Sequence, residues 1–198
     1  MTEMEDKRFI KDYFAQMEQC LQLTPEFEKQ LIDMKDKWVE TSKRGGKVIF
    51  LGNGGSAGIA SHLAIDVAKN GGIRATTFSD AALITCLAND YGFEEWMRHA
   101  VRIYAKPEDT IVAISCSGKS KNLLGGVEQA KEMGLDVITL TGMAPANPLK
   151  QMGDLNLWLD SYAYNIIETV HQFWCMTALD MSIGKSEYSA QNVTQLRS

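Results

Sequence analysis

The sequence predicts an α/β fold in which a parallel β-sheet carries helices on both faces. From Gly46 onward, short apolar or β-branched segments alternate with segments of helical periodicity. Most of these short segments are continuously apolar, as strands buried on both faces are. A length of 198 residues suits one domain with a substantial core. Alternation of strands and helices at this spacing is typical of parallel sheets with crossover helices.

The first 45 residues predict two helices. Residues 7–23 carry apolar side chains at spacings of three and four, and Thr24 then caps a second helix that has Pro25 at its first position. Basic residues and glycines at 43–46 end it. Both helices have apolar stripes that the domain or another subunit must cover. We therefore expect residues 1–45 to serve oligomer packing and residues 46–198 to form the ligand-binding domain.

The sheet and the last helix follow from the rest of the pattern. A final helix should run from Tyr164 to Ile183 and stop at Gly184. The strand candidates are residues 47–52, 75–79, 110–115, 136–142 and 155–160.

Composition excludes several classes of protein. Hydrophobic residues make up 45% of the chain and charged residues 23%, as in ordinary globular proteins. A net charge of -5 argues against a nucleic-acid groove. The chain shows no stretch of about 20 apolar residues that would span a membrane, and its beginning does not read as a signal peptide. The four cysteines are scattered, as expected for reduced thiols in the cytoplasm.

A glycine-rich loop, GNGGSAG at residues 52–58, follows the first strand and precedes a helix. In open α/β sheets ligands bind at the carboxyl ends of strands. Glycines let backbone N–H groups approach an anion, and the helix N-terminus adds partial positive charge. The loop matches neither GxGxxG nor a P-loop. The alternative is a tight strand-to-helix turn without a ligand.

Two further strand ends are rich in polar groups. SCSGKSKN at 115–122 offers the hydroxyls of Ser115, Ser117 and Ser120 just before a helix, and such loops bind phosphate without many cations. The segment 79–93 offers carboxylates and amides that would hold sugar hydroxyls or simply cap helices. Together the loops indicate a phosphorylated, hydroxyl-rich small molecule.

Four stretches, FLGNGGSAGIASHLAID, SDAALITCLANDYGF, VAISCSGKSKNLL and VITLTG, together resemble the SIS (sugar isomerase) domain, in the branch of the phosphoheptose isomerases. The resemblance covers residues 46–184. It implies a three-layer α/β/α sandwich with a five-stranded parallel sheet, a homotetramer with sites between subunits, and isomerisation of sedoheptulose 7-phosphate to heptose 7-phosphate. In bacteria this activity supplies heptose for lipopolysaccharide or other surface sugars.

Individual site residues follow from the same resemblance. Asp90 matches a substrate-contacting aspartate, and His62 matches a histidine that ligates zinc in several members. Asp66 stands where the family has its catalytic glutamate, shortened by one methylene, which is enough to displace a general base. The family's first sugar-phosphate loop corresponds to Asn53, Gly54, Gly55 and Ser56, and its phosphate-binding serines to Ser115, Ser117 and Ser120.

The last helix departs from the family pattern. In IETVHQFWCM, Glu168 stands where relatives often have glutamine, His171 matches the first histidine, and Met176 replaces the catalytic one. A thioether cannot carry a proton, so we expect Asp66 to act as the base with His171 or Glu168 as the second proton carrier. His62, Asp66, Glu168 and His171 would also suit zinc or another divalent ion. The alternative is that His62 and His171 are structural.

Three functions are consistent with these residues. The first is a phosphoheptose-type isomerase with an altered catalytic site, and with weak or absent turnover because of Met176. The second is a non-catalytic SIS module that binds a sugar phosphate as a regulator or scaffold. The third is an isomerase on a different sugar phosphate. We expect no nucleic-acid or membrane partner.

Overall fold

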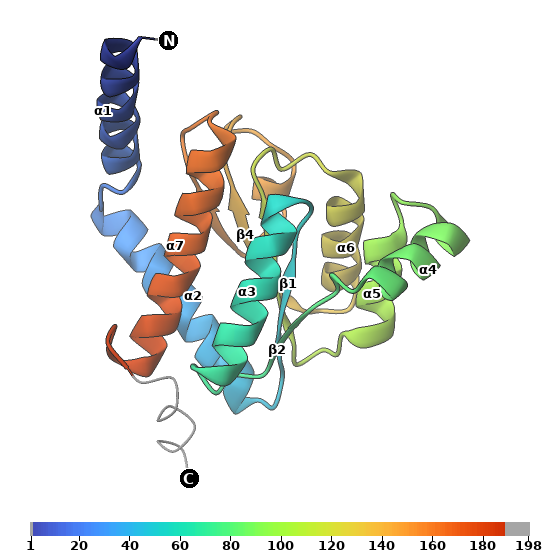
Figure 1. Ribbon diagram of the computed structural model, residues 1–198. Coiled ribbons are helices and arrows are strands. Elements are labelled where there is room, and N and C mark those ends of the chain that lie inside the picture. The colour runs from blue at the N-terminus through green and yellow to red at the C-terminus, as the bar shows by residue number, and fades with distance from the viewer. Residues whose placement is uncertain (1, 189–198) are drawn as a thin grey trace.

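The computed structural model describes residues 2–188, so the outermost positions of the two expected units, Met1 and 189–198, lie outside it. A five-stranded sheet lies between two helical layers, as predicted (Figure 1). The strands are β1 (Val48–Leu51), β2 (Ala75–Thr77), β3 (Thr110–Ser115), β4 (Asp136–Thr141) and β5 (Leu155–Trp158). The helices are α1 (Glu3–Cys20), α2 (Pro25–Lys43), α3 (Gly55–Lys69), α4 (Ala81–Tyr91), α5 (Trp96–Tyr104), α6 (Lys121–Glu132) and α7 (Tyr164–Ile183), with a short 3₁₀ turn, η1 (Leu149–Gln151).

All strand pairings are parallel, in the order β2-β1-β3-β4-β5. β1 pairs with β2 on one side and with β3 on the other, so the chain changes direction across the sheet between β1 and β3. Such a switch point leaves a crevice at the carboxyl ends of the two strands. The glycine-rich loop follows β1 and the serine-rich loop follows β3, so the fold brings both predicted loops to one place.

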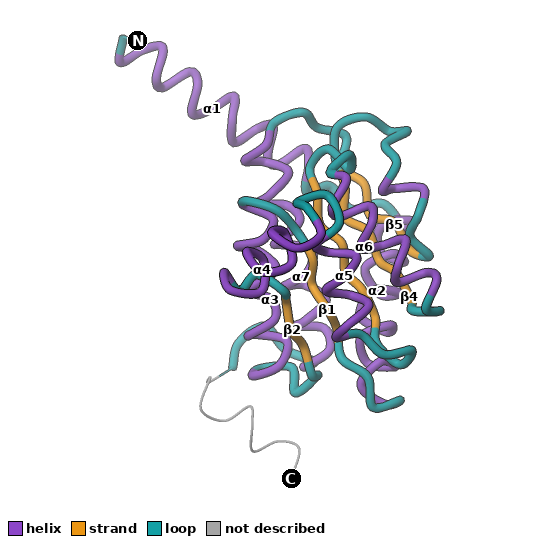
Figure 2. The backbone as a smooth tube through the Cα atoms, turned by 90° about the vertical axis from the view of Figure 1, so that its right-hand side faces the viewer, coloured by secondary structure: helices purple, strands orange, loops and turns teal. Residues whose placement is uncertain are grey.

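Each face of the sheet carries its own core. Helices α2, α3 and α7 cover one face, where the rings of Trp38 and Phe50 meet edge to face at 5.6 Å between centroids. Helices α4, α5 and α6 cover the other face with Trp96, Met97 and their neighbours (Figure 2). The predicted end of α7 is confirmed: Gly184 adopts a left-handed φ of 87°. Among residues 2–188, no helix is both long and apolar enough to cross a bilayer.

The two N-terminal helices differ in their packing. α2 buries Leu31, Met34, Trp38 and Thr41 against the sheet and α7. α1 projects from the body and buries none of its residues (Figures 1 and 2). Even the apolar side chain of Phe14 is 72% exposed.

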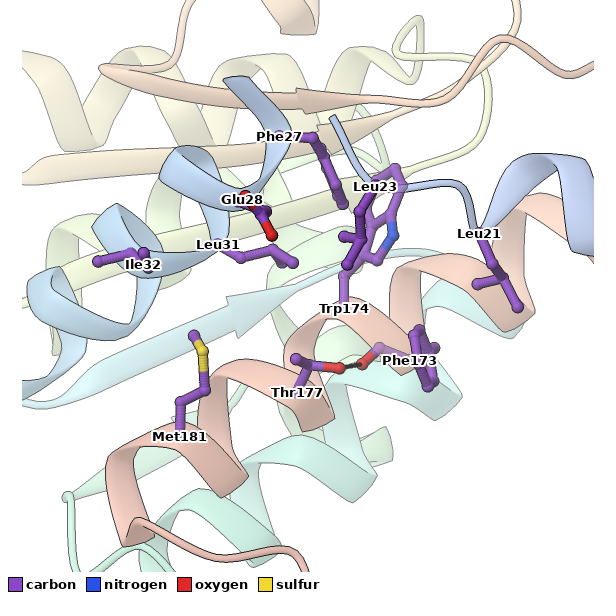
Figure 3. Close-up of a pocket in the computed structure, with 10 residues that line it drawn as sticks. All are labelled: Leu21, Leu23, Phe27, Glu28, Leu31, Ile32, Phe173, Trp174, Thr177 and Met181. Atoms are coloured by element: carbon purple, nitrogen blue, oxygen red, sulfur yellow. Dashed lines mark hydrogen bonds between the residues drawn. The ribbon is translucent and has the colours of Figure 1, made fainter. Parts of the chain in front are cut away.

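An apolar pocket of about 480 Å³ opens where the α1–α2 connection passes α7 (Figure 3). The rings of Phe27 and Trp174 form part of its wall, with centroids 4.6 Å apart. The lining residues are Leu21, Leu23, Phe27, Glu28, Leu31, Ile32, Phe173, Trp174, Thr177 and Met181. This apolar pocket and exposed apolar side chains of α1 such as Phe14 lie uncovered in a single chain.

Candidate functional site

The two loops at the switch point are tied together by a pair of side-chain amides. Asn53 donates to Asn122 at 3.0 Å and accepts from it at 2.9 Å. Asn122 is buried and its Oδ1 also accepts from the backbone N–H of Leu123 at 2.9 Å, which fixes the first turn of α6. A pocket of about 520 Å³ lies over this pair, lined by Asn53, Gly54, Phe93, Glu94, Ser120, Lys121 and Asn122. We name it the loop pocket.

The first loop presents the N-terminus of α3. Gly54 is the N-cap residue, with φ 55° and ψ -124°, a conformation that favours glycine. No side chain caps this helix end. Ser56, in the first turn of the helix, is buried. Backbone N–H groups at such an end attract an anion.

The second loop uses its serines in different ways. Ser115 is buried, and its hydroxyl accepts from the backbone N–H of Gly118 at 3.0 Å, so it shapes the turn. Ser117 accepts from the N–H of Lys119 at 3.3 Å. Ser120 is the N-cap of α6, and its hydroxyl makes no capping bond. The hydroxyls of Ser117 and Ser120 are therefore better placed for a ligand than that of Ser115.

Gly118 is required by its surroundings. Its φ is 63°, and a Cβ at this position would overlap the side chain of Asn147. Asn147 is buried and accepts from the backbone N–H of Lys150 at 2.9 Å while donating to the carbonyl of Ala144 at 2.9 Å. The loop conformation is thus held from beneath by the β4–η1 connection.

A second hollow, of about 650 Å³, runs between α3 and α7. We name it the helix groove. It is lined by Gly55, Gly58, Ile59, Asn165, Glu168, Thr169, Gln172, Phe173 and Met176. The two helices are parallel neighbours in Figure 1, so residues that lie along one helix face their counterparts on the other in the same order.

Glu168 occupies the loop end of this groove. Its carboxylate lies against the Cα of Gly55, where any Cβ would overlap it. Cys116, at the end of β3, approaches Glu168 Oε1 through its Sγ at 3.9 Å. Burial, and next the negative charge of Glu168, raise the pKa of Cys116 to about 11, so this thiol is protonated and unreactive.

His62 and Asp66 form a contact on α3 further from the loops. Nε2 of His62 lies 3.1 Å from Oδ2 of Asp66, and the two side chains are 48% and 26% exposed, so both are accessible to a ligand. Nδ1 of His62 lies 3.1 Å from Nε2 of Gln172 on α7. Gln172 was not among the residues singled out from the sequence. Its position four residues after Glu168 and four before Met176 is the signal that places it on the same helix face.

His171 is separated from the other three candidates. Its side chain is fully buried on the side of α7 that faces the sheet, and its Nε2 lies 3.2 Å from the carbonyl oxygen of Thr141. Burial lowers the pKa of His171 to about 4, so the ring is neutral. The expected convergence of His62, Asp66, Glu168 and His171 does not occur within one chain, because position 171 points into the core.

The positions of these side chains also decide whether one chain can form a zinc site. Among residues 2–188, no three His, Cys, Asp or Glu side chains lie close enough to hold a metal ion. Both ring nitrogens of His62 already have neighbours, and the Glu168 carboxylate lies beside Gly55 at the first turn of α3. The donors of a single chain do not fit a zinc site.

The third polar segment caps α4 and presents Asp90 at the surface. Asp80 is the N-cap of α4 and accepts from the N–H of Leu83 at 2.9 Å, which is the capping role left open above. Asp90 lies on the exposed surface of α4, where it accepts from the side chain of Asn89 at 3.0 Å.

Comparison with known proteins agrees with this architecture. A family model described as the SIS domain matches residues 12–142. A phosphoheptose isomerase from Helicobacter pylori is 31% identical over 174 residues, which cover 85% of this chain and 90% of that protein. A phosphoheptose isomerase from Rhodospirillum rubrum is 37% identical over 137 residues, or 65% of this chain and 71% of that one.

Solved structures show the same likeness. A phosphoheptose isomerase from Neisseria gonorrhoeae superposes with a TM-score of 0.80 at 27% identity, covering 89% of this chain and 98% of that chain. One from Francisella tularensis gives 0.80 at 25% identity, covering 92% and 98%. The matched family model, the curated relatives and the switch-point loops agree, and the chain belongs to the SIS domain family.

Proposed function

We propose that this protein is a sugar-phosphate isomerase of the phosphoheptose isomerase type, which interconverts sedoheptulose 7-phosphate and heptose 7-phosphate at an altered catalytic site. The observation that carries the proposal is the loop pocket: two helix N-termini and their hydroxyls, locked together by Asn53 and Asn122 at the switch point. The activity named for the Helicobacter pylori and Neisseria gonorrhoeae relatives supports the same substrate class.

The phosphate of the substrate is assigned to the loops. Backbone N–H groups at Gly55 and Ser56 and the hydroxyls of Ser117 and Ser120 supply the donors that a phosphate needs, while Ser115 holds the second loop in shape. Asn53 and Gly54 line the space where the sugar would lie. Lys121 already pairs with Glu94 at 3.0 Å, so its charge is shared and the pocket depends chiefly on neutral donors.

The proton chemistry is assigned to carboxylates. Aldose–ketose isomerisation needs one group that moves the proton next to the carbonyl and another that serves the oxygens. Asp66 is the proposed base and Glu168 the proposed second carrier, because His171 is buried and neutral. Asp66 lies eleven residues after Gly55, about 16 Å along α3. That is longer than an extended seven-carbon sugar phosphate. One substrate would therefore be held by the loops and Glu168 of one copy and would meet Asp66 of a second copy.

A site shared between copies requires an oligomer, and we propose a homotetramer. The apolar pocket and the unburied face of α1 supply hydrophobic surface for such contacts. Light scattering at micromolar concentration should report a tetramer, and Phe14→Glu on α1 should dissociate it. A monomeric native protein would overturn both the assembly and the shared site.

The proposed setting is the bacterial cytoplasm, in a route toward lipopolysaccharide or another surface sugar. The four cysteines are unpaired within the described residues, in keeping with a reducing compartment.

Incubation with sedoheptulose 7-phosphate, followed by NMR of the sugar carbons, tests the proposal. We expect conversion to the aldose by the native protein and a loss of at least about a hundredfold in Asp66→Asn. Binding of the sugar phosphate should persist in that variant, because asparagine keeps the size of Asp66 and the phosphate donors belong to the loops.

One observation favours a second function. Met176 lines the helix groove and carries no proton, as expected of a binding module that acts as a regulator or scaffold. Saturable binding of sedoheptulose 7-phosphate without any turnover would select this function over the isomerase.

A further inference from the structure

We propose that Gln172 is a positioning residue, which holds the Nε2–H group of His62 beside Asp66 and keeps the ring from acting as a metal ligand. The observation is a chain of three side chains across two helices. Gln172 on α7 lies 3.1 Å from Nδ1 of His62, and Nε2 of the same ring lies 3.1 Å from Asp66 on α3. The catalytic consequence rests on the proposed function, whereas the state of the His62 ring does not.

The chemistry of the three groups fixes where the proton lies. The NH₂ group of Gln172 only donates hydrogen bonds, so Nδ1 of His62, 3.1 Å away, is the acceptor and carries the lone pair. The ring hydrogen is then on Nε2, which lies 3.1 Å from Oδ2 of Asp66. Gln172 therefore donates to His62, and the Nε2–H group of His62 lies beside Asp66.

The geometry explains why one glutamine matters. His62 and Asp66 are an i, i+4 pair on one helix, and such a contact between partly exposed side chains is weak and rotationally free by itself. Gln172 comes from the neighbouring helix, so it restricts the ring from outside α3. A carboxylate that must remove a proton from carbon loses rate when its orientation is not maintained.

The same contacts use both nitrogens of the ring. A histidine binds a metal through a nitrogen lone pair, and the only lone pair of this ring points at the Gln172 amide. Met176, which stands in the place of the family's second histidine, supplies no imidazole on the facing turn. We infer that the Nε2–H group of His62, and not a metal ion, is the neighbour of Asp66.

Imidazole nitrogen NMR of the assembled native protein tests the inference directly. The chain has three histidines, so His62→Gln identifies the signals of His62. We expect a proton on Nε2 and a bare Nδ1 in the native ring. In Gln172→Leu the two tautomers should mix, and in Gln172→Glu, which keeps the size but only accepts, the proton should appear on Nδ1. Gln129→Leu, the same change on α6 across the sheet, should leave the His62 spectrum as it was.

Kinetics and metal binding complete the test. In Gln172→Leu we expect kcat to fall about tenfold with KM changed less than about threefold, and Gln129→Leu should match the native rate. Zn²⁺ alone, added to the native protein, should not shift the His62 signals. A native Nδ1–H tautomer, an unchanged ring in Gln172→Leu, or Zn²⁺ binding at His62 would each overturn the proposal. Absence of turnover in all samples would count against the proposed isomerase, while the ring spectra would still decide the role of Gln172.

Discussion

The loop pocket is formed mainly by backbone groups and the helix groove mainly by side chains, although the two hollows adjoin at Gly54 and Gly55. The loop pocket depends on backbone: two helix N-termini, a glycine at φ 55°, and a pair of amides that joins the loops. The helix groove depends on the identity of single side chains on α7, such as Glu168, Gln172 and Met176. A pocket of the first kind survives most substitutions nearby, whereas one of the second kind changes its chemistry with a single residue. Ligand binding and catalysis are therefore separable in this fold.

α7 shows the same contrast across one helix. Glu168, Gln172 and Met176 line the groove at intervals of four, while His171 and Cys175 face the core. One residue of displacement along the helix turns a side chain by about 100°, which is enough to move an imidazole from the site into the hydrophobic interior.

The largest expected effect is the loss of stability in acid caused by His171. It would test whether this side chain faces the core and not the helix groove. Burial holds the pKa of His171 at about 4, below the value of about 6.5 that it has in the unfolded chain. The unfolded state therefore binds the extra proton first, and stability is lost as the pH falls from about 6.5 to about 4. The loss should approach about 3 kcal/mol for this residue.

Urea denaturation across that range, on the native protein and on His171→Gln, measures the difference. The glutamine stays neutral, so its unfolding free energy should fall less steeply with acid than that of the native chain. Equal slopes in the two proteins would show that His171 is exposed to solvent, as a groove residue would be.

The loop serines come next in size. The double variant Ser117→Ala and Ser120→Ala should bind sedoheptulose 7-phosphate about 10- to 100-fold more weakly, because the phosphate loses two hydroxyl donors. Calorimetric titration gives the affinity, and Ser182→Ala near the end of α7, whose hydroxyl bonds to its own helix, is the matched control. An unaltered affinity in the double variant would mean that the phosphate binds elsewhere.

A smaller effect is expected where the two loops are joined. Asn53→Ala removes both amide bonds to Asn122 and leaves that buried amide short of a partner. We expect destabilisation of about 1 to 2 kcal/mol and ligand affinity reduced several-fold, since the loops lose their alignment. Asn89→Ala, an exposed amide on α4, should change neither quantity. If Asn53→Ala binds as the native protein does, the backbone alone aligns the loops.

The loop pocket could be predicted from the sequence, and the helix groove could not. Glycines and serines after apolar strands mark a ligand edge because backbone geometry repeats in every parallel sheet. For Asp80 the sequence leaves binding and capping open, since a carboxylate before a helix does either, whereas Asp90 lies within α4 next to its last residue. His171 and Gln172 are adjacent in sequence, and only the direction in which α7 packs on the sheet decides which of them faces His62. Likewise the apolar stripes of α1 and α2 look alike, although only α2 is covered by its own sheet.

The smallest expected effect is the change in kcat when Met176 is replaced. It tests whether the helix groove needs a proton carrier at this position. From the sequence alone, a methionine in place of the family's histidine predicts weak turnover. The structure adds two facts: Asp66 already contacts His62, and His62 is tied to Gln172. With Glu168 of a neighbouring copy as second carrier, the proton chemistry needs no group at position 176. We therefore expect kcat of Met176→His to lie within about threefold of the native value, and Met176→Leu, which conserves volume, to do the same. Steady-state assay of both variants beside the native enzyme measures this.

A rise of about tenfold or more in Met176→His alone would show that the native groove lacks a proton carrier. In that case the pattern of the last helix, and not the His62 contact, describes the chemistry of this protein.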